Sequence, residues 1–85
     1  MLPIHHFTLI VDGADLQDDA VIDALFEAGC DDATVGRTDG IQYLDFDREA
    51  ATRAEAIRSA VTGVERVDGV HVVRIATAEP RPAVT

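Results

Sequence analysis

The spacing of apolar residues along the chain changes between two periods and predicts six elements. Runs with the β-branched and aromatic composition of strands are His5–Val11, Ala33–Arg37, Ile41–Asp47 and Val70–Ile75. Apolar residues at helical spacing predict two helices, Gln17–Ala28 and Thr52–Arg66. The first strand run is almost continuously apolar, which is typical of a central strand.

Turn and capping residues separate these elements. Gly29 follows the first helical run, where a left-handed residue after the helix is needed. Asp39-Gly40 is a turn signal, and we expect Gly36–Gly40 to form the loop between two strands. Thr52 and Glu55 have the spacing of a capping box at the start of the second helix.

The order β-α-β-β-α-β predicts an α+β, ferredoxin-like fold. Right-handed crossovers place the first and third strands in the middle of a four-stranded antiparallel sheet, with two helices on one face. We expect a single domain over residues 1–75 and a flexible C-terminal tail over residues 76–85, which contain two prolines. The expected core residues are Leu9, Leu25, Phe26, Leu44, Phe46, Ile57 and Val61.

The second face of this sheet has no helix left to cover it. By alternation it carries Thr8, Ile10, Ile41 and Tyr43, with either Val70 and Val72 or His71 and Val73. Scattered exposed apolar groups are ordinary, whereas a contiguous apolar strip usually marks an interface. We therefore predict an open-face interface at Ile10, Ile41 and Tyr43, which could support a weak homodimer.

Charge is the most unusual bulk property of the chain. There are 16 Asp and Glu residues against 7 basic residues, all arginine, and the net charge is −9. Repulsion from phosphates argues against direct binding to nucleic acid or to an anionic membrane. The acidity either reflects a GC-rich coding sequence or forms a surface for a basic partner. For such a partner the candidate residues are Asp19, Asp23 and Glu27 on the first helix, and Asp45 and Asp47 on the third strand.

The residues that could bind a metal or act as a nucleophile are better explained by structural roles. Adjacent His5 and His6 point to opposite faces of a strand and cannot readily share a metal ion. Cys30 is followed by Asp31 and Asp32, whose charges would raise the thiol pKa, so we interpret it as a small buried apolar residue. We expect no enzyme activity, no cofactor and no metal, because the chain has no phosphate loop, nucleophilic triad or zinc spacing.

Localisation is inferred from what the chain lacks. It has no apolar run long enough to span a bilayer and no N-terminal signal pattern. The single cysteine agrees with a reducing compartment. These features predict a cytoplasmic protein.

Several segments resemble the N-terminal domain of poorly characterised bacterial proteins that continue into a helix-turn-helix DNA-binding segment. They are F-T-L-I-V-D-G, the run from Phe26 to Gly36, D-F-D-R-E-A, A-I-R-S-A-V and V-x-G-V-x-V, spread over His5 to Ile75. The resemblance implies the fold more firmly than an activity. Because this chain stops at Thr85, where the DNA-binding part would begin, we expect a fragment or a free-standing copy. A free-standing copy is not expected to bind DNA as the longer relatives would.

Two classes of function follow. The first is a protein-binding inhibitor or nucleic-acid-mimicking decoy of a basic, nucleic-acid-binding partner, similar in size and charge to phage anti-CRISPR proteins and to some immunity proteins or antitoxins. The second is a free-standing regulatory, dimerisation or ligand-sensing module. Clustering of the acids on one face favours the first class. An even distribution beside an apolar open sheet favours the second.

Overall fold

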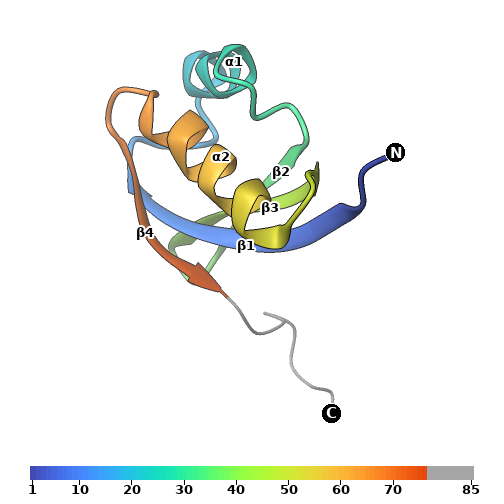
Figure 1. Cartoon of the computed structure of the whole chain (residues 1–85). Coiled ribbons are helices and arrows are strands. Elements are labelled where there is room, and N and C mark those ends of the chain that lie inside the picture. Colours follow the sequence, from blue (N-terminus) through green and yellow to red (C-terminus); the bar gives the residue numbers. More distant parts are fainter. Residues whose placement is uncertain (77–85) are drawn as a thin grey trace.

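The computed structural model describes residues 1–76 and contains the six predicted elements in the predicted order (Figure 1). Every bound lies within two residues of the one expected from the sequence. The elements are β1 (Ile4–Gly13), α1 (Asp19–Glu27), β2 (Ala33–Thr38), β3 (Ile41–Glu49), α2 (Arg53–Glu65) and β4 (Val70–Ala76).

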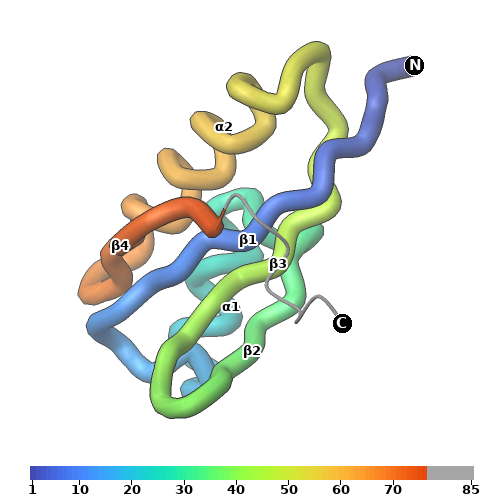
Figure 2. The backbone as a smooth tube through the Cα atoms, turned by 90° about the horizontal axis from the view of Figure 1, so that it is seen from below, coloured from blue at the N-terminus to red at the C-terminus, as the bar shows by residue number. Residues whose placement is uncertain are grey.

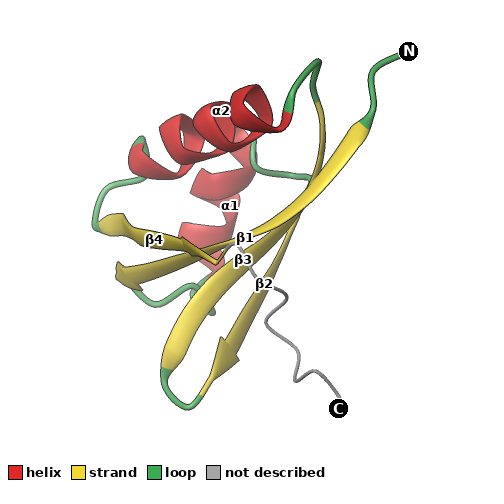
Figure 3. Ribbon diagram, turned by 60° about the horizontal axis from the view of Figure 1, so that its bottom comes forward, coloured by secondary structure: helices red, strands yellow, loops and turns green. Residues whose placement is uncertain are grey.

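The four strands form one antiparallel sheet in the order β2-β3-β1-β4. Both helices lie on one face of this sheet (Figure 3), and the view of the opposite face shows the strands without a covering helix (Figure 2). The prediction of a ferredoxin-like α+β fold is therefore confirmed. Neither helix of the described residues has the length and apolar character needed to cross a membrane.

The β2–β3 hairpin turns within two residues. Asp39 and Gly40 both have positive φ, 52° and 78°, as a type I′ turn requires, and Thr38 pairs directly with Ile41. The expected loop from Gly36 to Gly40 was therefore too long. Gly36 instead lies inside β2 and is paired with Tyr43, whose ring lies over it. Glycine is needed at this position because a Cβ would overlap that ring.

Glycine ends α1 as the sequence predicted. Gly29 has φ of 93°, and its N–H donates to the Phe26 carbonyl at 3.1 Å. The next N–H, of Cys30, donates to the Leu25 carbonyl at 2.9 Å. This pair of bonds is a Schellman motif, which satisfies helix carbonyls that would otherwise lack partners.

Side-chain oxygens cap the starts of both helices. The Asp18 carboxylate accepts from the Ala20 N–H at 2.8 Å, so α1 begins at Asp19 rather than at Gln17. The Thr52 hydroxyl accepts from the Glu55 N–H at 3.1 Å, which confirms one half of the capping box predicted for α2. The return bond from the Glu55 side chain to the Thr52 N–H is absent from residues 1–76.

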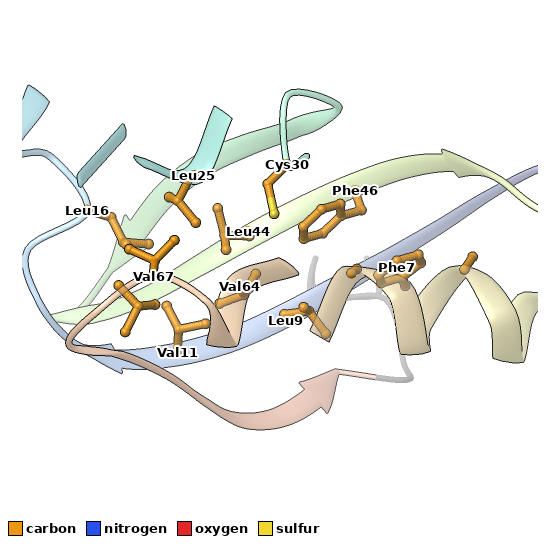
Figure 4. Close-up of a cluster of buried hydrophobic side chains, with 13 residues drawn as sticks. Phe7, Leu9, Val11, Leu16, Leu25, Cys30, Leu44, Phe46, Val64 and Val67 are labelled. Atoms are coloured by element: carbon orange, nitrogen blue, oxygen red, sulfur yellow. The ribbon is translucent and has the colours of Figure 1, made fainter. Parts of the chain in front are cut away.

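The core lies between the sheet and the helices (Figure 4). Phe7 of β1 and Phe46 of β3 stack with ring centroids 5.3 Å apart. The buried apolar residues are Phe7, Leu9, Val11, Leu16, Leu25, Cys30, Leu44, Phe46, Ala56, Ala60, Val64, Val67 and Val70. Four predicted core residues are among them, and the predicted Ile57 and Val61 are partly buried and pack against this cluster.

Phe26 was wrongly expected in the core. Its side chain is 53% exposed, whereas the preceding Leu25 is 1% exposed. Successive residues on a helix point about 100° apart, and only Leu25 of α1 is fully buried. The apolar stripe of α1 is therefore wider than the side of the helix that the sheet covers, and Phe26 lies on the uncovered flank.

The predicted tail begins one residue too early, because Ala76 is the last residue of β4. The rest of that segment, residues 77–85, lies outside the described residues.

These burial differences predict a contrast between neighbouring residues. Leu25→Ala or Phe46→Ala should lower the free energy of unfolding by about 2–5 kcal/mol, since each deletes a large buried side chain. Phe26→Ala should change it by less than about 1 kcal/mol, because the ring is already half solvated. Urea denaturation of the three variants measures this contrast. Equal losses for Leu25→Ala and Phe26→Ala would contradict the placement of α1.

Candidate functional site

The face of α1 that points away from the sheet is strongly acidic. Asp19, Asp23 and Glu27, which we call the acidic row, are all exposed and follow one another at four-residue spacing. None of the three carboxylates has a hydrogen bond or ion pair within residues 1–76. At a rise of 1.5 Å per residue, neighbouring members of the row are about 6 Å apart along the helix axis, and the whole row is about 12 Å long. These carboxylates are therefore available to a partner.

The acidic row lies in the part of the sequence where acidic residues are densest. The segment from Asp15 to Asp32 contains seven acidic residues and no arginine. Two of the seven are neutralised within the fold, since Asp15 pairs with Arg37 at 2.9 Å and Asp32 pairs with Arg48 at 2.8 Å. The remaining five are on α1 or immediately beside it.

Phe26 adds an apolar group to this surface. It follows Asp23 by three residues and Asp19 by seven, so its ring lies on the flank next to the acidic row. An aromatic ring beside unpaired carboxylates combines an apolar anchor with charge. Sequence reasoning missed this combination, because it assigned Phe26 to the core.

The strand acids Asp45 and Asp47 belong to a different surface. Both point from β3 to the open sheet face, and both already have partners on β1. Asp45 accepts a hydrogen bond from the Thr8 hydroxyl, and Asp47 lies 2.7 Å from the His6 Nδ1. Because the helices cover the opposite face, the structure does not bring these acids together with the acidic row.

The apolar strip of the open face is present but interrupted. Ile10 and Tyr43 are paired across β1 and β3 and are partly buried, and Ile41 is 50% exposed. Of the two alternatives for β4, Val70 and Val72 turn toward the core, which leaves His71 and Val73. A bulge in β4 then places Arg74 opposite Ile10, so a charged residue borders the strip.

Arg48 of β3 connects the end of α1 to the sheet and to α2. Its Nε and Nη2 donate to the two Asp32 oxygens, each at 2.8 Å. Nη2 also donates to the Gly29 carbonyl at 2.6 Å, and Nη1 donates to the Ser59 hydroxyl at 3.1 Å. The guanidinium carbon is 5.1 Å from the centre of the Phe46 ring. Hydrogen bonding to Arg48 is the main cause that lowers the pKa of Asp32.

Cys30 lies beneath this network and is buried among core residues (Figure 4). Burial is the main cause that raises its thiol pKa; the charges of Asp32 and Asp31 act in the same direction, and Arg48 opposes them. The interpretation of Cys30 as a buried apolar residue is confirmed. The predicted effect of the acids is secondary to desolvation.

The histidine pair is separated as expected. His5 is within hydrogen-bond distance of the Ala50 carbonyl, 3.1 Å, while the His6 ring meets Asp47 on the other face. Across residues 1–76, no three His, Cys, Asp or Glu side chains are grouped so that they could hold a metal ion.

Comparisons of the chain with models of protein families, with curated proteins and with solved structures gave no match. The resemblance to the N-terminal domain of helix-turn-helix proteins thus stays a prediction.

The Asp32–Arg48 pair predicts a pH dependence of stability. The folded state lowers the pKa of Asp32 below its usual value of 3.8. Ionised Asp32 therefore contributes fully to the free energy of unfolding well above pH 3.8. This contribution is lost as the pH falls through the lower pKa of the folded state. Asp32→Asn should cost about 1–3 kcal/mol near pH 7 and progressively less below pH 4.

Asp31→Asn is the matched control, since Asp31 is adjacent and exposed. Urea denaturation at several pH values measures both variants. A loss for Asp32→Asn that is constant from pH 7 to pH 3, or an equal loss for Asp31→Asn, would contradict the role of the pair.

Proposed function

We propose that this domain is a non-enzymatic protein-binding module, and that the acidic row of α1 occupies a basic, nucleic-acid-binding surface on another protein. The observation that carries the proposal is the unpaired acidic row beside the exposed Phe26 ring. By this proposal the domain acts as an inhibitor or decoy, in the manner expected of an anti-CRISPR-like, immunity or antitoxin-like protein.

The charge of α1 supports a basic partner. Arginine and lysine side chains that hold phosphates also bind carboxylates through charge-assisted hydrogen bonds. A regular helix holds Asp19, Asp23 and Glu27 in one line, so they can meet a line of basic side chains together. The net charge of −9 would accelerate encounter with such a partner and would repel nucleic acid itself.

Phe26 supports a protein rather than a free cation as the partner. Aromatic residues are enriched in the centres of protein–protein interfaces, where a few buried anchors supply most of the binding energy. The Phe26 ring is 53% exposed, so its apolar surface is in contact with water in the free protein. Burial of that surface against a partner would contribute favourable free energy to binding. The carboxylates would then give orientation and a fast, salt-sensitive association, screened over about 8 Å at physiological ionic strength.

Charge reversal tests the proposal. Replacement of Asp19, Asp23 and Glu27 by Arg should weaken capture of the partner from a host lysate at least about tenfold, and Phe26→Ala should weaken it by a similar factor. The fold should persist, because all four side chains are exposed. Excess DNA or RNA should displace the wild-type protein from the captured partner.

The matched control reverses Asp12, Asp47 and Glu49, three exposed acids on the open sheet face. It changes the net charge by the same amount on the opposite side of the sheet. Equal losses for both triple variants would mean that only net charge matters. Retention of the partner by the α1 variant, or indifference to nucleic acid, would reject the decoy function.

A second candidate, a pairing or regulatory module, is favoured by the paired Ile10 and Tyr43 on the uncovered sheet face. It predicts weak self-association that Ile10→Asp and Tyr43→Asp abolish, measured by sedimentation at high micromolar concentration. Both side chains are partly buried, so circular dichroism must first show that each variant folds. A monomeric wild-type protein would reject pairing through this face.

A further inference from the structure

Positive charge gathers in one place on this acidic domain. A groove of about 430 Å³ runs between the C-terminal end of α1 and the exposed side of α2. Its charged and hydroxyl-bearing lining consists of Arg48, Glu55, Arg58, Ser59, Thr62 and Arg66. Three of the six arginines in the described part of the chain therefore face one groove, against a single lining carboxylate. We call it the arginine groove.

Two of these arginines have no acceptor within the fold. Arg58 and Arg66 are exposed, and neither guanidinium group has a hydrogen bond or ion pair within residues 1–76. They are eight residues apart on α2, so their Cα atoms are separated by about 12 Å along the helix. Thr62 lies midway between them on the same side. Side chains from both ends can converge on an anion that is longer than a single phosphate.

The floor of the groove is already fixed. Four of the five N–H donors of Arg48 are used by Asp32, Gly29 and Ser59, and its guanidinium group also interacts with the Cys30 sulfur. The Gly63 position keeps α2 close to the end of α1, because a Cβ there would lie 3.0 Å from the Ala28 carbonyl oxygen. The groove therefore does not need to form when a ligand arrives.

We propose that the arginine groove binds an oligophosphate anion, the chemistry shared by pyrophosphate and the phosphate chain of a nucleotide. Arg58 and Arg66 would hold its two ends, and the Thr62 hydroxyl would contact its middle. The volume is within the range of about 300–1,000 Å³ typical of small-molecule sites. Glu55, at the N-terminal end of α2, would keep the anion toward Arg66.

This site adjoins the acidic row, because Arg66 and Glu27 both line a neighbouring groove, but the two sites use different side chains. The anion would bind to the arginines of α2, whereas the proposed partner binds to the carboxylates of α1. Failure of one proposal therefore leaves the other standing.

Calorimetric titration of the full chain with pyrophosphate, at constant ionic strength, tests the inference. The wild-type protein should bind with one-to-one stoichiometry, and Arg58→Gln and Arg66→Gln should each weaken binding at least about tenfold. Arg74→Gln is the matched control, because Arg74 is exposed on the opposite face and its guanidinium group also has no acceptor in the described chain. It should leave the affinity unchanged.

Parallel titrations distinguish the sources of the anion. Orthophosphate should bind more weakly than pyrophosphate, because it cannot reach both arginines, and adenosine triphosphate should match pyrophosphate if the base makes no contact. Three outcomes would overturn the proposal: no binding of pyrophosphate, an equal loss for Arg74→Gln, or equal binding of a Glu-rich peptide.

Discussion

One guanidinium group holds the helix layer against the sheet at the end of α1. Arg48 of β3 holds both oxygens of Asp32, the carbonyl of Gly29 and the hydroxyl of Ser59, and it lies over the ring of Phe46. These contacts join a central strand to the end of α1, to the start of β2 and to α2. The side chain of Arg48 is only 13% exposed, so its charge would be costly without the matching carboxylate. The arrangement holds α1 by its end rather than by a broad apolar face.

The start of α1 is fixed in a similar way. Gln42, a buried polar residue, accepts from the Leu16 N–H at 2.7 Å and donates to the Ala14 carbonyl at 3.0 Å. Leu16 is fully buried, and Leu25 is the only fully buried residue within α1 itself. With polar contacts at both ends, α1 needs little apolar surface to stay in place. Much of the helix is thus free to carry charge and an exposed aromatic ring, which is the physical basis of the proposed binding surface.

Local signals in the sequence were sufficient for the fold, because each acts within a few residues. Gly29 and Asp39-Gly40 need positive φ, and the structure has it at these positions. Phe26 was misplaced because the spacing of apolar residues does not show how far the sheet extends beneath the helix. Arg48 and Gln42 were missed because their partners lie 16 and 26–28 residues away along the chain. The acidic row could be read from its spacing, whereas its separation from the strand acids depends on which sheet face the helices cover.

In the proposed function α1, and not the open sheet face, is the surface that binds the partner. Nuclear magnetic resonance of the isotopically labelled chain, titrated with the captured partner, tests it most directly. The largest amide shift changes and line broadening should occur at Asp19, Asp23, Phe26 and Glu27, with little change along β1 and β3. Changes centred on Ile10 and Tyr43, with α1 unaffected, would contradict it.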